Sequence, residues 1–350
     1  MLATSRERKI WVDYAKVIGI YLIVLGHHVL NPRLNGEIFC FHVPLFFFLS
    51  GFLFSFDKFS SFKDFFLRRF RQIVIPYISF QILTYFFWLF IARHFGNDAD
   101  LGIKWYTPII GFFYGDNVGY FMFNDSPLWF LTCLFMIENL YFLVFKSLYH
   151  KKILYWVAVL SFIAIAFINF TFNKVIRLPW NFDVALTGVV FYAIGNKLSS
   201  VKIKSGLGST FIISLSGVFC FILFCYTSAT NLLVDFATNF FQNYWLMYLN
   251  AFLGITFVCV LCYLIALIFK RNRLIEYISE NTLSIFALQF MVMSFVKGFY
   301  HFILKYPVNA FDGNIVVNLF LAVCDILLII PAALFFERFT PWLIGRKGKK

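Results

Sequence analysis

The first long apolar stretch of the chain carries a lysine and a histidine at helical spacing. Ten residues separate Lys16 from His27. In an α-helix this offset of eleven positions is about three turns, or roughly 16 Å along the axis, so both side chains share one face. Ionisable side chains are costly in hydrocarbon and usually face a bundle interior or a wet cavity. The pair therefore predicts a functional site within a membrane-embedded helix.

A further histidine lies near the start of the next apolar stretch. If residues 11–30 and 38–56 form consecutive antiparallel helices, His27 and His42 reach similar depths near one membrane face. Imidazole titrates near neutral pH and can take a proton from a hydroxyl group. His27 and His42 are therefore candidate catalytic bases. The neighbouring His28 is interpreted as an interfacial residue without a role.

The composition indicates the class of protein that holds these groups. Of the 350 residues, 61% are hydrophobic, 22% are aromatic and only 13% are charged, which excludes a soluble domain of this length. The net charge of +13 arises from basic residues in short connections between apolar runs, which argues against a nucleic-acid partner. The seven cysteines lie in or beside apolar runs, so neither a disulfide framework nor a metal site is predicted.

Apolar windows predict an all-α, polytopic bundle of about ten transmembrane helices in one domain, residues 1–350. The windows are 11–30, 38–56, 73–93, 128–147, 153–171, 183–198, 208–227, 244–269, 282–300 and 314–336. With ten crossings, 22 of the 30 lysines and arginines fall on one side. Because basic loops stay inside, both termini are predicted to be cytoplasmic.

The longest predicted outer loop, residues 94–127, contains an apolar piece from Trp105 to Tyr114 that is too short to span a membrane. Two interpretations are open. The piece is either a re-entrant or interfacial segment that forms a lid over a site, or part of an aromatic belt at headgroup level.

Other polar residues within or beside the apolar runs complete the candidate set. Glu138 is a lone carboxylate in its helix and is a catalytic candidate that would orient an imidazole or pair with Lys16. The substrate-binding candidates are Trp129, Asp13 and Ser50. Asp13 either orients Lys16 or caps its helix, while Ser50 with Gly51 also fits a close helix contact. Asp325 and Lys297 are candidates for an intramembrane pair.

Several stretches resemble the integral-membrane acyltransferase 3 family. The first helix matches its pattern of a basic residue, ten residues and a histidine, with Lys16 where the family often has Arg. Further similar stretches are Phe41 to Phe54, Arg68-x-x-Arg71 before Pro76, Pro127 to Glu138, and Asn281 to Gln289. In the family the last of these stretches often ends in His, where this chain has Gln289. Within the family, the chain looks nearest to the fucose 4-O-acetylase-like branch.

The resemblance implies a membrane O-acyltransferase, most simply an O-acetyltransferase of the cell inner membrane that modifies a sugar hydroxyl of an envelope or exported polysaccharide. The donor would be cytoplasmic acetyl-CoA, whose phosphates would rest on Arg68, Arg69 and Arg71, with Lys16 just inside. No metal is implied. The surrounding partner is membrane lipid, and a homo-oligomer is left open.

The rival interpretation is a transporter or flippase for a sugar or lipid-linked glycan, because intramembrane charges also suit alternating access. Against it, no inverted repeat or matching pair of Gly/Pro-broken helices is evident in the sequence.

Overall fold

The computed structural model describes residues 9–95, 101–116, 121–172, 177–201, 206–269 and 271–346. Arg6 and Arg8, which contribute to the predicted orientation, lie outside these ranges. In chain order the elements are α1 Ile10–Gly26, α2 Pro32–Phe39, α3 His42–Leu53, η1 Phe56–Lys58, α4 Phe62–Arg69, the π-helical η2 Phe70–Val74, α5 Ile75–Phe90, η3 Ala92–His94, α7 Thr107–Tyr114, η5 Phe123–Leu128, α8 Trp129–Phe145, α9 Lys152–Phe172, η6 Pro179–Asn181, α10 Phe182–Leu198, α11 Leu207–Ser228, β1 Val234–Asp235, β2 Phe240–Phe241, α12 Tyr244–Ile268, α13 Arg273–Glu280, α14 Thr282–Gly298, the π-helical η7 Phe299–Ile303, α15 Ile315–Phe339 and η8 Pro341–Ile344.

The fold is an all-α, multi-pass bundle, as the sequence predicts. Within the described ranges, eight helical segments are long and apolar enough to cross a membrane: Pro32–Leu53, Phe62–His94, Phe123–Phe145, Lys152–Phe172, Leu207–Ser228, Tyr244–Ile268, Thr282–Ile303 and Ile315–Phe339. The other two predicted segments are α1 and α10, which have 17 residues each. At about 1.5 Å per residue each is about 26 Å long, slightly less than a hydrocarbon core of about 30 Å.

The helices differ in how much of their surface other helices cover. In the apolar window of Pro32–Leu53, 72% of the residues are buried within the protein, against 11% in α11. Helices α1 and α10 also carry buried residues along most of their length. The short helices α1, α3 and α10 therefore form the centre, while α9 and α11 present apolar side chains to lipid.

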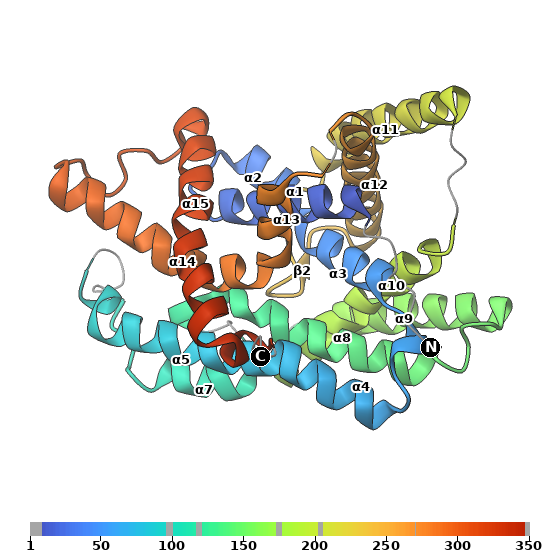
Figure 1. Ribbon diagram of the computed structural model, residues 1–350, viewed down its shortest axis with the longest axis horizontal. Helices are drawn as coiled ribbons and strands as arrows, with labels where there is room; N and C mark the ends of the chain where they lie inside the picture. The colour runs from blue at the N-terminus through green and yellow to red at the C-terminus, as the bar shows by residue number, and fades with distance from the viewer. Residues whose placement is uncertain are drawn as a thin grey trace.

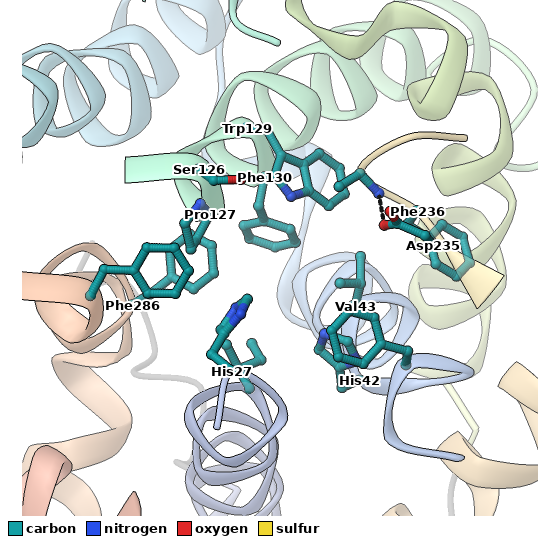
Figure 2. A pocket seen from close by; sticks show the side chains of 14 residues that line it. His27, His42, Val43, Ser126, Pro127, Trp129, Phe130, Asp235, Phe236 and Phe286 are labelled. Atoms are coloured by element: carbon teal, nitrogen blue, oxygen red, sulfur yellow. Dashed lines mark hydrogen bonds between the residues drawn. The ribbon is translucent and has the colours of Figure 1, made fainter. Parts of the chain in front are cut away.

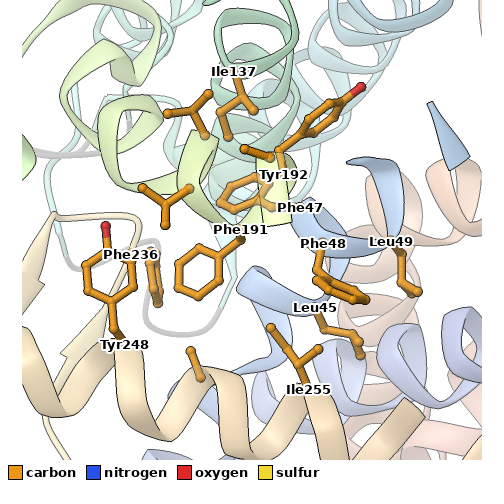
Figure 3. Packing of buried hydrophobic residues seen from close by; sticks show 14 of the residues in the cluster. Leu45, Phe47, Phe48, Leu49, Ile137, Phe191, Tyr192, Phe236, Tyr248 and Ile255 are labelled. Carbon is orange, nitrogen blue, oxygen red and sulfur yellow. The ribbon is translucent and has the colours of Figure 1, made fainter. Parts of the chain in front are cut away.

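The buried residues form two hydrophobic clusters, both of which include helices of this centre. One joins α3, α8, α9, α10 and α12, and Figure 3 shows part of it, with Phe47 and Phe191 among its members. The other joins α1, α5, α14 and α15. In Figure 1, α14 and α15 stand on one side of α1, and α11 and α12 on the other.

Helices α3 and α10 touch backbone to backbone through two glycines. A Cβ atom on Gly51 would lie 2.0 Å from the Tyr192 carbonyl oxygen, and one on Gly195 would lie 2.2 Å from the Phe48 carbonyl oxygen. Beside this contact, the Asn196 amide donates hydrogen bonds of 2.9 Å to the carbonyls of Gly51 and Phe54. The last carbonyls of α3 lack the regular helical partners four residues on, and α10 thus supplements the local bond of 3.1 Å from the Phe54 N–H to the Gly51 carbonyl.

The substitution Gly51→Ala is expected to lower the stability of the protein by about 3 kcal/mol, the upper end of the usual cost of overpacking, because the added methyl meets backbone. Gly208→Ala is the matched control, since nothing lies within 4 Å of a Cβ at that position of α11. Thermal unfolding in detergent measures both. Equal melting temperatures for the two variants would contradict the close contact.

The π-helical turn η2 adjusts the chain between the basic segment and α5. Pro76 has no N–H to donate, so the regular bonding pattern is interrupted here, and the Ile75 N–H bonds to the Phe70 carbonyl five residues earlier. Arg69 and Arg71 lie immediately before and within this widened turn. The widened turn therefore changes the helical phase between the basic segment and α5. This change affects the direction in which Arg69 and Arg71 point relative to α5.

The predicted apolar piece of the 94–127 loop is the eight-residue helix α7, too short to span a membrane. It packs against the chain that leads into η5, since a Cβ on Gly111 would lie 2.1 Å from the Met122 nitrogen. The Phe112 ring also stacks on Tyr77 of α5, with 5.7 Å between ring centroids. Helix α7 is therefore tied to the bundle, and both the lid and the aromatic-belt interpretations stay open.

Candidate active site

A cavity of about 250 Å³ lies where α1, α2, α3, α14, the η5–α8 junction and the β1–β2 hairpin meet. Figure 2 shows it, with the His27 ring pointing into the space between Pro127, Phe130 and Val43. Its walls are mainly aromatic and carry few polar groups. They are formed by Ile23, His27, Phe39, His42, Val43, Ser126, Pro127, Trp129, Phe130, Asp235, Phe236, Ala237, Phe286 and Phe290.

His27 follows the last turn of α1, which directs its imidazole into the cavity. Its backbone N–H bonds to the Val24 carbonyl at 3.2 Å and closes the helix. Phe290 of α14 and Phe39 of α2 meet the imidazole edge to face, with ring centroids at 4.8 Å and 6.4 Å. Within the described part of the chain, neither ring nitrogen bonds to another residue. The ring is thus held by packing, and its nitrogens are available to a substrate.

His42 is the first residue of α3, and its ring is fixed by the preceding helix. Its Nδ1 lies 2.8 Å from the Ile38 carbonyl oxygen. A carbonyl only accepts hydrogen bonds, so Nδ1 carries the hydrogen and a neutral ring leaves the Nε2 lone pair free. The side chain is buried and borders the same cavity as His27. The structure therefore brings together the two imidazoles that the sequence places at similar depth.

Trp129 also lines this cavity, at the start of α8. The next residue, Phe130, lies between the cavity and the core: its ring stacks on Phe47 at 5.1 Å and meets Phe286 edge to face at 5.4 Å. Aromatic walls of this kind favour flat or weakly polar groups over free charges. The substrate-binding role predicted for Trp129 stays a prediction, in a position that suits it.

Lys16 lies on the same stripe of α1 as His27 but is not among the residues that line the cavity. The stripe runs Lys16, Gly19, Ile23, His27, with spacings of three and four residues. Ile23 and His27 border the cavity, whereas Gly19 is covered by Phe46, whose ring would lie 2.8 Å from a Cβ at that position. The Phe46 ring meets the Phe130 ring at 6.2 Å, and the half-buried Lys16 lies beyond the aromatic layer that these two rings form beside α1.

The predicted substrate-binding residues Asp13 and Ser50 also lie away from the cavity walls. The Asp13 carboxylate is buried and accepts a hydrogen bond of 2.6 Å from the Ser279 hydroxyl, which joins the start of α1 to α13. Ser50 is half-buried on α3, next to the glycine that contacts α10. Their predicted roles stay predictions.

Glu138 and the basic segment form a separate group. The Arg69 guanidinium makes an ion pair of 2.9 Å with the buried Glu138 carboxylate, and the Tyr192 hydroxyl lies 3.5 Å from the same carboxylate. Arg68 pairs with Asp64 at 3.2 Å on the surface, while Arg71 is exposed. Glu138 does not border the cavity of His27 and His42. Its predicted catalytic role and the donor-binding roles of the three arginines stay predictions.

Two polar contacts were not expected from the sequence. His28, interpreted as an interfacial residue, is buried, and its Nε2 lies 2.9 Å from the Asp325 carboxylate in α15. Asp325 thus pairs with His28 and not with Lys297. The two partners are 297 positions apart, so no local pattern could have revealed the pair.

Asp235 and the arginine that supports its hairpin were also not expected from the sequence. Asp235 lines the cavity. The Arg177 guanidinium donates to the Ala237 carbonyl at 2.9 Å and forms ion pairs with the buried carboxylates of Asp116 and Asp183, at 3.2 Å and 2.9 Å. The only available signal was a set of acidic and basic residues in predicted outer loops.

A family model described as an acyltransferase domain matches residues 9–337, nearly the whole chain. The chain belongs to the acyltransferase 3 family. This acyltransferase has no match among curated proteins or solved structures. Membership identifies it as a membrane enzyme that transfers acyl groups, in agreement with the apolar helices that span most of its length.

Proposed function

We propose that this acyltransferase moves an acetyl group from cytoplasmic acetyl-CoA to a sugar hydroxyl of a cell-envelope or exported polysaccharide at the outer side of the inner membrane, and that it belongs to the fucose 4-O-acetylase-like branch. The observation that carries the proposal is the convergence of His27 and His42 in one small aromatic cavity. An imidazole that acts as general base toward a hydroxyl group needs an unprotonated ring nitrogen within hydrogen-bond reach of the bound substrate.

In the proposed reaction, His27 takes the proton of the acceptor hydroxyl as its oxygen attacks the thioester carbonyl. The new C–O bond forms, the C–S bond breaks, and the proton passes from His27 to the departing thiolate of CoA. In a second route the imidazole attacks the thioester first, the C–S bond breaks and CoA leaves as a thiolate; the acceptor hydroxyl then takes the acetyl group from the acyl-histidine and restores the imidazole. Ping-pong kinetics would identify the second route. His42, with Nδ1 bonded to Ile38, is placed to accept a hydrogen bond through Nε2.

The donor is proposed to bind at the opposite end of the molecule. Its phosphates would be held by Arg68, Arg69 and Arg71, with Lys16 nearer the cavity. Arg69 is already paired with Glu138, whereas Arg71 is exposed within the widened turn η2. Guanidinium groups suit phosphate because they offer paired donors and a permanent charge.

The arrangement of the predicted loops supports their division between two faces, and the proposal takes the face with both termini as the cytoplasmic one. Segments predicted to be inside lie together: Asp13 bonds Ser279, Arg346 donates to the Glu280 carbonyl at 2.7 Å, and Gly345 contacts the backbone of Arg71. Segments predicted to be outside, including Arg177 and the β1–β2 hairpin, border the cavity end. The two proposed substrates would therefore approach from opposite faces.

The test of the proposed function uses purified protein in lipid vesicles, labelled acetyl-CoA and an oligosaccharide acceptor. Labelled, acetylated oligosaccharide is the expected product, and it requires both substrates. A carrier would show acceptor-driven counterflow of sugar without any acetylation. That result, with no label on the acceptor, would replace this proposal with the transporter interpretation.

The substitution Lys16→Ala is expected to raise the apparent KM for acetyl-CoA by about tenfold and to leave the acceptor KM nearly unchanged, because Lys16 lies on the donor side of the aromatic layer. One charge-assisted contact of about 1.5 kcal/mol corresponds to this factor. Initial rates measured with each substrate varied in turn separate the two constants. An unchanged donor KM would show that Lys16 has no part in donor binding.

A further inference from the structure

Asp235 is the carboxylate that borders the cavity of His27 and His42. Figure 2 shows it across the cavity from His27, beside Phe236 on the hairpin. One carboxylate oxygen accepts a hydrogen bond of 2.9 Å from the Ala237 N–H, and the other accepts one of 2.8 Å from the Thr238 hydroxyl. A carboxylate offers about four acceptor positions, so about two stay available for a ligand.

The hairpin that carries Asp235 is held firmly in place. Val234 pairs with Phe241 in the two-residue ladder, and the Gln242 N–H bonds to the Leu233 carbonyl at 2.9 Å. Arg177 anchors the turn through the Ala237 carbonyl and is itself fixed by two buried carboxylates. Asp235 is therefore positioned before any substrate enters, as a binding group should be.

The surroundings of Asp235 define the ligand chemistry. The cavity of about 250 Å³ is smaller than the roughly 300–1,000 Å³ of sites for drug-sized ligands, so it suits one sugar unit. Its aromatic walls can cover the apolar faces of a sugar ring. A carboxylate accepts hydrogen bonds from hydroxyl groups, and bonds to an ionised acceptor are roughly twice as strong as neutral ones.

We propose that Asp235 binds a hydroxyl of the acceptor sugar other than the one that is acetylated, and thereby determines which hydroxyl faces His27. This inference rests on the proposed function. It makes Asp235 a specificity-determining residue of the acceptor site, with no part in donor binding.

The alternative is that Asp235 only shapes the turn, since aspartate often bonds backbone N–H groups two positions on. Asparagine serves in such turns equally well, which makes Asp235→Asn the decisive variant: it keeps an acceptor for Ala237 and removes the charge. Asp312→Asn is the matched control, because Asp312 is an exposed carboxylate of the segment before α15, outside this cavity.

The experiment measures acetyl transfer from labelled acetyl-CoA to methyl α-L-fucoside and to its monodeoxy analogues, together with thermal unfolding of each variant. For Asp235→Asn we expect the acceptor KM to rise about tenfold, with the donor KM and melting temperature unchanged. With the unaltered enzyme, one deoxy analogue should have an acceptor KM about tenfold above that of the parent fucoside. With Asp235→Asn, the KM for this analogue should rise little further. Asp312→Asn should match the unaltered enzyme throughout.

The outcomes separate this inference from the proposal on which it rests. If the unaltered enzyme transfers no acetyl group to any fucoside, the proposed acceptor class fails. If transfer occurs and Asp235→Asn matches the unaltered enzyme, the inference is wrong and the turn alone explains Asp235. A lowered melting temperature or a raised donor KM in the variant would also overturn it, because either marks a structural effect.

Discussion

Replacing His27 with alanine is expected to lower acetyl transfer by a factor of 10² to 10⁴, the usual contribution of a positioned general base. The imidazole points into the cavity, is held by Phe39 and Phe290, and has no other polar contact within the described ranges. Its loss therefore removes chemistry without breaking a hydrogen bond of the fold. Initial rates with labelled acetyl-CoA measure the effect, and thermal unfolding should show little change.

His150→Ala is the control for this substitution, because His150 is an exposed imidazole in the turn between α8 and α9. It should retain full activity. His42→Ala distinguishes the two imidazoles of the cavity. A larger loss of rate for His42→Ala than for His27→Ala would transfer the role of the base to His42, and normal transfer by His27→Ala would refute the proposed mechanism.

Replacing Arg177 with methionine is expected to destabilise the protein by about 3–5 kcal/mol, the usual cost of breaking a buried ion pair. The Arg177 side chain is 13% exposed, and its partners Asp116 and Asp183 are only 2% and 3% exposed. Without the guanidinium, the buried carboxylates of Asp116 and Asp183 would both lose their ion pair with Arg177, and the hairpin would lose its anchor at Ala237. Chemical or thermal unfolding in detergent measures the loss.

The control is Arg33→Met, which breaks a surface pair with Glu37 whose side chains are 65% and 21% exposed. Exposed pairs contribute about 0–1 kcal/mol, so this variant should unfold almost as the unaltered protein does. Adding Asp116→Asn and Asp183→Asn to Arg177→Met should recover part of the stability. Equal losses of stability in Arg177→Met and Arg33→Met would show that the buried ion pairs of Arg177 stabilise the protein no more than an exposed pair does.

Features that repeat along the chain were predictable from the sequence. Apolar runs of membrane length mark the helices, and the eleven-residue offset places Lys16 and His27 on one stripe of α1. Reversal of the chain between α1 and α3 brings His42 to the depth of His27, and the structure shows both at one cavity. These inferences succeed because helical periodicity and bilayer thickness act locally on the sequence.

Contacts between distant segments were not predictable in this way. The sequence suggests that Glu138 faces an imidazole or Lys16, whereas the structure pairs it with Arg69 at the end of the neighbouring helix α4. Asp235 stands in a hairpin whose strands have two residues each, too short for a strand pattern. The packing of helices against one another determines which buried charges meet. A single sequence contains no local pattern that reveals these contacts.

The aromatic layer between Lys16 and His27 has a consequence for the membrane itself. Phe46 lies against Gly19, and its ring meets Phe130 at 6.2 Å, so aromatic rings cover this face of α1 between Lys16 and the cavity. The thioester of a donor bound at the Lys16 end, as proposed, reaches His27 only after these rings have moved aside. Until they move, the same rings also block water and ions from crossing the bilayer along this face of α1.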